Sequence, residues 1–314
     1  MKISILLATY NGEKYLREQL DSILNQDFKD FILYISDDGS SDNTLKIIAD
    51  YSKKDERIRI LPKHEPNKSA CKHFLYMLEN VESDLFLFSD QDDVWTKDHV
   101  STLVNRYSIL SEDIKNKPVL IHGDLEVVEE NLDRISDSYI NYMNLPKNPK
   151  NKHFYFVQNN VTGCVMLINN ELKNFVFLNK QDLLKDTSSI IMHDSFFATI
   201  ACEFGKKIYV DKAIELYRQH GKNVVGAYDT KSSKYIIRRF LDKKKYQEEL
   251  KAYRKFALFF KSYFEEKLSE IELNKLNIFA NLKEYSKIYR IFFVIKNGFL
   301  KHGIKRNIGY LLFL

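Results

Sequence analysis

The sequence is most informative at residues 85–95, LFLFSDQDDVW. The four leading apolar residues predict a strand buried on both faces, as in a parallel sheet. Asp90, Asp92 and Asp93 would then lie at the carboxyl end of that strand, where open α/β sheets bind their ligands. Carboxylates this close raise one another's pKa, and a hard divalent cation would relieve the repulsion. The plainer alternative is a polar loop whose Asp residues cap the next helix.

The chain before this stretch alternates between strand and helix patterns. Apolar runs predict strands at residues 2–8, 31–35, 57–61 and 84–89, with helices between them at 13–25, 42–53 and 68–78. This alternation is typical of a doubly wound α/β sheet with right-handed crossovers. Apolar runs at 119–124 and 208–217 predict two later strands.

Composition sets the broad class of the protein. The chain of 314 residues is 44% hydrophobic, which is enough for one large domain or two smaller ones. Its three cysteines are widely spaced and form no CxxC pair, so we expect a reducing compartment and neither a disulfide framework nor a zinc site. We find no secretory signal pattern and no apolar run of about 20 residues, and therefore predict no membrane span.

Charge divides the chain into two parts. Residues 229–314 carry 20 Lys and Arg against 9 Asp and Glu, whereas residues 1–228 carry 28 against 34. A basic tail after a mildly acidic front part predicts two modules with different partners.

Two nucleotide-binding fingerprints are missing. No GxGxxG follows the first predicted strand, where the turn is Thr9-Tyr10-Asn11-Gly12, and no GxxxxGK[ST] occurs in the chain. Hydride transfer and P-loop ATP chemistry are therefore disfavoured.

Five motifs in order resemble a known family: ISILLATYNGEKYL, SDDGSSDNT, FSDQDDVW, MHDSF and YRQHGKNVVG. Together they resemble a family 2 glycosyltransferase with a GT-A fold, and most closely the bacterial rhamnosyltransferases that build cell-wall or capsular polysaccharide. The resemblance covers about residues 1–228. It implies a Rossmann-like, mostly parallel sheet flanked by helices. The segment NKSACKHF (67–74) departs from the family pattern, because Ser69 and His73 replace a usual Gly and Asn.

The resemblance assigns donor-binding roles to several residues. The nucleoside would be held by Thr9, Tyr10 and Asn11 together with Asp38, beside Asp37, and Asp90 would face the ribose or a metal-bound water. For Asp37 and Asp38 the alternative is an ordinary turn that precedes a helix. Lys72 and Arg218 suit the diphosphate, and Gly163 matches a glycine loop that borders the donor sugar and the acceptor.

The resemblance also assigns a metal and a base. Asp92 and His220 would hold Mn²⁺ or Mg²⁺ at the diphosphate, although a lone histidine is more often structural. Asp194 would be the general base that takes the proton of the acceptor hydroxyl. The alternative is that Asp194 caps the helix expected at residues 195–202.

The tail, residues 229–314, mixes aromatic and basic residues at helical spacing. We expect a helical extension that contacts an anionic membrane surface or a lipid-linked acceptor. The alternatives are helices that pack on the catalytic domain, residues 1–228, or on a second subunit as a homodimer. A nucleic-acid partner does not fit the acidic front part.

The sequence thus predicts an inverting, metal-dependent glycosyltransferase. It would move L-rhamnose from dTDP-rhamnose to a saccharide or lipid-linked acceptor for surface polysaccharide, in the cytoplasm at the inner face of the plasma membrane. The alternatives are a UDP-hexose donor in the same fold, a nucleotidyltransferase, and a non-catalytic nucleotide-sugar-binding scaffold at the membrane.

Overall fold

Nine strands form one sheet in the computed structural model, which describes residues 1–221, 226–227 and 242–314. Their order is β3-β2-β1-β4-β8-β6-β9-β5, and β7 pairs with β6 alone. The strands are β1 (Ile3–Thr9), β2 (Ile32–Asp37), β3 (Ile58–Ile60), β4 (Leu85–Ser89), β5 (Val94–Trp95), β6 (Val119–Val128), β7 (Arg134–Ser136), β8 (Met166–Asn169) and β9 (Lys206–Arg218).

Six of these strands point the same way. The pairings of β1 with β2 and β4, of β2 with β3, and of β6 with β9 are parallel. Strand β8 is inserted antiparallel between β4 and β6, and the short strands β5 and β7 are also antiparallel to their partners. The predicted mostly parallel sheet is confirmed, with β8 as the reversed strand inside it.

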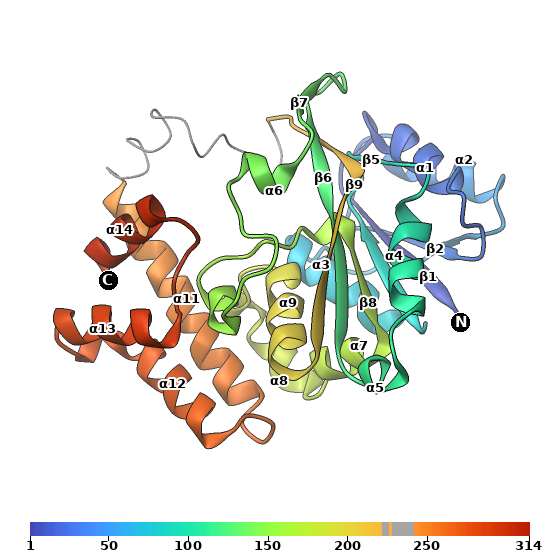
Figure 1. Ribbon diagram of the computed structural model, residues 1–314. Helices are drawn as coiled ribbons and strands as arrows, with labels where there is room; N and C mark the ends of the chain where they lie inside the picture. Colours follow the sequence, from blue (N-terminus) through green and yellow to red (C-terminus); the bar gives the residue numbers. More distant parts are fainter. Residues whose placement is uncertain (222–225, 228–241) are drawn as a thin grey trace.

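Helices cover both faces of the sheet (Figure 1). In the α/β part they are α1 (Leu16–Leu24), α2 (Thr44–Ser52), α3 (Ala70–Asn80), α4 (His99–Ser108), α5 (Glu112–Lys115), α6 (Tyr139–Tyr142), α7 (Asn170–Val176), α8 (Lys180–Lys185) and α9 (His193–Phe204). Side chains alternate between the two faces along each strand. In β4, Leu85 and Leu87 therefore join one apolar cluster with α1, α2 and α4, whereas Phe86 and Phe88 join another with α3 and α9.

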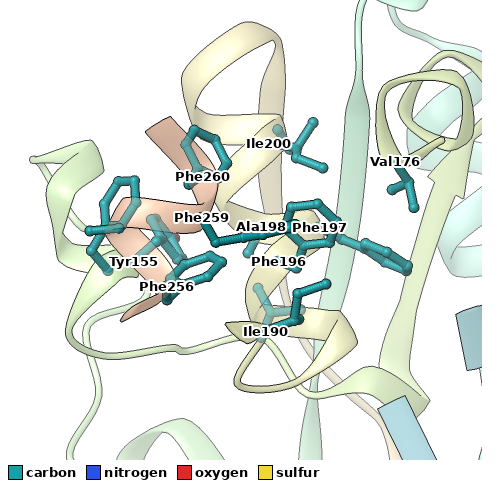
Figure 2. Close-up of a cluster of buried hydrophobic side chains, with 14 of the residues drawn as sticks. Tyr155, Val176, Ile190, Phe196, Phe197, Ala198, Ile200, Phe256, Phe259 and Phe260 are labelled. Carbon is teal, nitrogen blue, oxygen red and sulfur yellow. The ribbon is translucent and has the colours of Figure 1, made fainter. Parts of the chain in front are cut away.

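In the part of the C-terminal region that the structure describes, α-helices pack beside the α/β part, with α11 next to α9 (Figure 1). These are α11 (Lys243–Tyr263), α12 (Glu270–Ala280), α13 (Lys287–Asn297) and α14 (Ile304–Phe313). Their apolar residues belong to the same buried cluster as those of α3 and α9. Figure 2 shows Phe256, Phe259 and Phe260 of α11 beside Phe196 of α9. The helices thus share a core with the α/β part.

The predicted elements agree with the structure to within a few residues, and the exceptions are informative. Helix α9 begins at His193 rather than Ser195, so Asp194 lies in its first turn. The short strands β5 and β7 had no clear sequence signal. The boundary expected between residues 228 and 229 lies outside the described residues. Within the described chain, no helix is both long and apolar enough to cross a membrane.

The shared core can be tested with Phe256, whose buried ring lies 5.5 Å from Phe156 and 6.3 Å from Phe196 between ring centroids. We expect Phe256→Ala to lower the free energy of unfolding by about 3–5 kcal/mol, because it removes a large buried ring. The measurement is urea denaturation followed by fluorescence of Trp95, the only tryptophan, which is buried in the α/β part.

Leu258→Ala on the same helix is the matched control. Leu258 is 49% exposed, so its loss should change stability by less than about 0.5 kcal/mol. If Phe256→Ala leaves the Trp95 transition unmoved, the C-terminal helices unfold separately and the shared core is wrong.

Candidate active site

The acidic turn that follows β4 lies beside the end of β9. The Asp92 carboxylate is 2.8 Å from Nε2 of His220, and the His220 ring stacks on Tyr15 of the β1–α1 turn at 5.2 Å. Three separate parts of the chain therefore meet at this pair. The structure brings together the two residues predicted to hold a metal.

Asp90, the first residue of this turn, is a buried carboxyl group close to other carboxylates. Burial and the neighbouring carboxylates of Asp92 and Asp194 raise the pKa of Asp90 to about 7. No hydrogen bond reaches the Asp90 carboxylate from the described part of the chain, so no protein donor offsets that rise. A bound cation or a ribose hydroxyl would do so.

Asp93 points away from the cavity into the protein. One of its carboxylate oxygens accepts the backbone N–H of Arg218 at 2.9 Å. Burial, together with Asp92 and Asp90, raises the pKa of Asp93 well above its usual range, and burial with the charge of Asp93 raises the pKa of Glu215 likewise. These two buried acids form a layer behind the acidic turn and do not reach the cavity.

Arg218 holds the turn in place. Its Nε donates to the Asp92 carbonyl at 2.9 Å, and its guanidinium also bonds to the Glu18 carboxylate and to the Glu130 carbonyl. The same group lies over the ring of Tyr15 at 4.8 Å. Arg218 is 3% exposed and does not line the cavity. The direct contact of Arg218 with a diphosphate stays a prediction. In the described residues its guanidinium donates to protein groups, which makes Arg218 a positioning residue of the acidic turn.

The turn after β1 is fixed by Gln91, the middle residue of Asp90-Gln91-Asp92. The side-chain amide of Gln91 accepts from the Tyr10 N–H and donates to the Tyr10 carbonyl, both at 2.8 Å. A Cβ on Gly12 would lie 2.2 Å from that amide oxygen, so a larger residue there would displace the Gln91 side chain from Tyr10. Asn11 adopts a left-handed φ of 49°, and its N–H donates to Ser40. The side chain of Tyr10 is exposed at the cavity.

The two acids after β2 have different surroundings. Asp37 accepts from Gly39, Ser40 and the Thr9 hydroxyl, which matches the ordinary turn. Asp38 lines the cavity, and its carboxylate accepts the backbone N–H groups of Asn67 and Lys68 at 2.5 and 2.9 Å. A carboxylate has about four acceptor positions, so Asp38 retains capacity for a ligand.

Asp194 lies at the start of α9, where it faces the cavity. Burial raises the pKa of Asp194 to about 7, and hydrogen bonds from the backbone of Ser195 and Gly163 and from the Asn159 side chain oppose that rise. Gly163 is confined too, because a Cβ there would lie 2.7 Å from Nε2 of His193. Asp194 is therefore a residue in the first turn of a helix and also a buried carboxyl group whose pKa lies near neutral pH.

One cavity of about 1780 Å³ connects these groups. It is lined by every predicted site residue except Arg218: Thr9, Tyr10, Asn11, Asp38, Lys72, Asp90, Asp92, Gly163, Asp194 and His220. The sequence did not indicate Tyr15, Gln91 or Asn159, whose roles depend on packing across separate elements. It also did not indicate that C-terminal residues Tyr246, Glu249, Tyr253, Lys301 and Arg306 line the same cavity.

Two further groups of side chains lie close enough to hold a metal ion: Asp38, His64 and His73, and Asp90, Asp93 and Cys164. In the first group both histidines bond to the Ser36 hydroxyl, at 3.1 and 2.9 Å. In the second, burial and nearby carboxylates raise the pKa of Cys164 well above its usual range, so the thiol keeps its proton. A protonated thiol is a poor ligand. Asp92 and His220, with Asp90 beside them, fit a divalent ion better.

The chain matches the family model described as Glycosyl transferase family 2 over residues 4–167. It is 30% identical to the dTDP-rhamnosyl transferase RfbG of Shigella flexneri over 253 residues, which is 78% of this chain and 82% of that protein. It is also 26% identical to the UDP-Glc:alpha-D-GlcNAc-diphosphoundecaprenol beta-1,3-glucosyltransferase WfgD of Escherichia coli, over 64% of this chain and 74% of that protein.

A solved structure shows the same fold. The crystal structure of S. aureus TarS 1-349 in complex with UDP-GlcNAc matches 99% of this chain and 90% of that chain, with a TM-score of 0.52 at 16% identity. The fold is therefore GT-A. The chain belongs to glycosyl transferase family 2 and is a glycosyltransferase, which sets aside the nucleotidyltransferase and the non-catalytic scaffold.

The pKa of Asp194 predicts how sugar transfer depends on pH. A carboxyl group accepts a proton only when it is ionised, so we expect kcat to rise from about pH 6 to about pH 8 and to fall about tenfold per unit below its pKa near 7. The measurement is kcat against pH with both substrates saturating. Donor binding across the same range is the control, and a flat kcat profile down to about pH 5 would contradict the assignment.

Proposed function

We propose that this glycosyltransferase is inverting and metal-dependent, and that it moves L-rhamnose from dTDP-rhamnose to a saccharide or lipid-linked acceptor in surface-polysaccharide synthesis. The observation that carries this proposal is one cavity in which the Asp92–His220 pair and the buried carboxyl of Asp194 both lie. The similarity to RfbG, a dTDP-rhamnosyl transferase, supports the donor, and the similarity to WfgD, named for a diphosphoundecaprenol-linked acceptor, supports a lipid-linked acceptor.

The donor would lie along the ends of β1, β2 and β4. Thr9, Tyr10, Asn11 and Asp38 line this part of the cavity and would hold the nucleoside, and Asp90 would face the ribose. Lys72, near the start of α3, presents a cation to the same cavity and would meet the diphosphate.

A divalent ion fits the residues present. Asp92 and His220 offer a carboxylate oxygen and an imidazole nitrogen 2.8 Å apart, and burial with the nearby carboxylates of Asp92 and Asp194 raises the pKa of Asp90 beside them. When bound, Mn²⁺ or Mg²⁺ would neutralise charge on the leaving diphosphate. Arg218 would keep Asp92 in position through its backbone carbonyl.

Asp194 would carry the proton transfer. Its carboxylate takes the proton of the acceptor hydroxyl as that oxygen forms a bond to the anomeric carbon of the donor. The bond between this carbon and the diphosphate oxygen breaks, and the nucleoside diphosphate leaves with the electron pair. Attack from the face opposite the leaving group inverts the anomeric configuration. Gly163 also lines the cavity, and its backbone hydrogen bond to Asp194 would help to hold the base in position.

The test is turnover of a panel of dTDP-, UDP- and GDP-sugars by the full chain, with Mn²⁺ or Mg²⁺ and with EDTA. We expect metal-dependent release of dTDP from dTDP-rhamnose. Asp194→Asn should lower transfer by roughly 10²–10⁴ while donor affinity measured by calorimetry stays unchanged, because the amide cannot accept the proton. Release from a UDP-hexose instead would keep the mechanism and replace the donor, and normal turnover by Asp194→Asn would remove the base assignment.

We also propose two functional units, a catalytic domain at residues 1–228 and a C-terminal helical unit at 229–314 that contacts the inner face of the plasma membrane. The helical unit carries exposed apolar side chains at helical spacing: Ile288, Phe292 and Ile295 on α13, and Ile304, Ile308 and Leu312 on α14. These two apolar stripes are 47–83% exposed, and lysines lie next to them in sequence. Apolar stripes with basic neighbours are typical of helices on anionic membranes.

Membrane contact predicts sedimentation with vesicles. We expect the full chain to sediment with phosphatidylglycerol vesicles, and the triple change Ile288→Ser, Phe292→Ser and Ile295→Ser to weaken this at least tenfold, because it removes the apolar contact. Ile109→Ser is the control, since Ile109 is 72% exposed in the α/β part. If the triple variant instead turns a dimer into a monomer in sedimentation velocity and leaves vesicle binding unchanged, a second copy of the chain covers the stripes.

A further inference from the structure

The cavity is larger than a donor needs. Its volume is about 1780 Å³, whereas sites for single small ligands are about 300–1,000 Å³. The predicted donor residues account for the part at the ends of β1, β2 and β4. Another part is lined by the C-terminal helical unit, which the proposed function above does not use for the reaction.

Helix α11 presents one face to this part of the cavity. Tyr246, Glu249 and Tyr253 are spaced three and four residues apart, so they share one side of the helix. Lys301, from the connection between α13 and α14, reaches the same place. Its ammonium is 2.9 Å from the Glu249 carboxylate and 5.1 Å from the centre of the Tyr253 ring.

These four side chains hold one another in place. The Tyr253 hydroxyl donates to Glu249 at 3.3 Å, and Lys301 lies 5.9 Å from the centre of the Tyr246 ring. A cation over aromatic rings with a carboxylate beside it has little freedom to move. The cluster Tyr246, Glu249, Tyr253 and Lys301, called here the tyrosine wall, is thus joined by contacts among its members.

The chemistry of the tyrosine wall matches a sugar ring. A pyranose has a face of C–H bonds that carry partial positive charge, and the face of a tyrosine ring is negative. The hydroxyl groups at the edge of the sugar need acceptors and donors, which Glu249 and Lys301 supply. An anionic ligand fits less well, because the Lys301 charge is already balanced by Glu249 at 2.9 Å.

We propose that the tyrosine wall binds the saccharide of the acceptor, with Tyr253 as the stacking platform. This rests on the proposed function, since it takes the cavity as the place of sugar transfer. The wall makes the C-terminal helical unit part of the acceptor site. Acceptor specificity would then be set by α11 and the α13–α14 connection, outside the family-model match at residues 4–167.

The test is binding of the fluorescently labelled full chain, with dTDP present, to an array of bacterial surface saccharides. We expect the wild type to bind a defined set, Tyr253→Ala to lose that binding by at least about tenfold, and Tyr253→Phe to keep it because the ring remains. Tyr289→Ala is the matched control, because Tyr289 lies on α13 and does not line this cavity.

Two results would overturn the proposal: no saccharide bound by the wild type, or the same binding by Tyr253→Ala. Donor hydrolysis by the same variants separates this proposal from the proposed function. If Tyr253→Ala still releases nucleotide from the donor at the wild-type rate in water but has lost array binding, the tyrosine wall serves the acceptor alone. If nucleotide release falls equally, Tyr253 acts on the donor or the fold, and the proposal is wrong.

Discussion

The buried guanidinium of Arg218 is the contact that the geometry of the site depends on. It reaches the acidic turn through the Asp92 carbonyl, helix α1 through Glu18, and the loop after β6 through the Glu130 carbonyl. Each of these three segments lies at least 88 residues from Arg218 along the chain, so they meet it only through tertiary structure. A planar group with five donors can join them, whereas a lysine could not match its directions. His220, two residues after Arg218, lies beside the Asp92 carboxylate.

The same region contains several carboxyl groups that are buried close to one another. Burial and mutual repulsion raise the pKa of Asp90, Asp93 and Glu215, and burial raises the pKa of Asp194. Holding these groups costs stability, because in the folded state they resist ionisation at a pH where the unfolded chain would ionise them freely. The guanidinium of Arg218 contacts the carbonyl of Asp92 rather than its carboxylate. A positively charged ligand at the site would explain this cost in stability, because it would stabilise the ionised carboxylates.

The alternation of strands and helices could be predicted because apolar runs and turns are local signals. The cluster at Asp90–Asp93 could be placed at a sheet edge for the same reason. The reversed strand β8 could not, because Met166–Asn169 is a short apolar run whose direction is set by where the chain enters the sheet. The positioning contacts of Arg218 could not be predicted, since the sequence shows a basic residue two positions before a histidine but not that its guanidinium donates to Asp92, Glu18 and Glu130. Tyr15 and Gln91 carry no signal of their own, because each acts on a segment far away in the chain.

The described residues of the C-terminal region lie in three different surroundings. From the sequence, its aromatic and basic residues predicted helices that contact a membrane. In the structure, some of its residues lie in the core, some line the cavity and some are exposed. Phe256 and Phe260 enter the core with Phe156, the tyrosine wall lines the cavity, and the apolar stripes of α13 and α14 face outward. Gly298 and Gly303 both adopt a left-handed φ and place Lys301 between α13 and α14. A short connection therefore joins an outward stripe to the cavity, so an acceptor whose lipid stays at the membrane would have its first sugars close to the tyrosine wall.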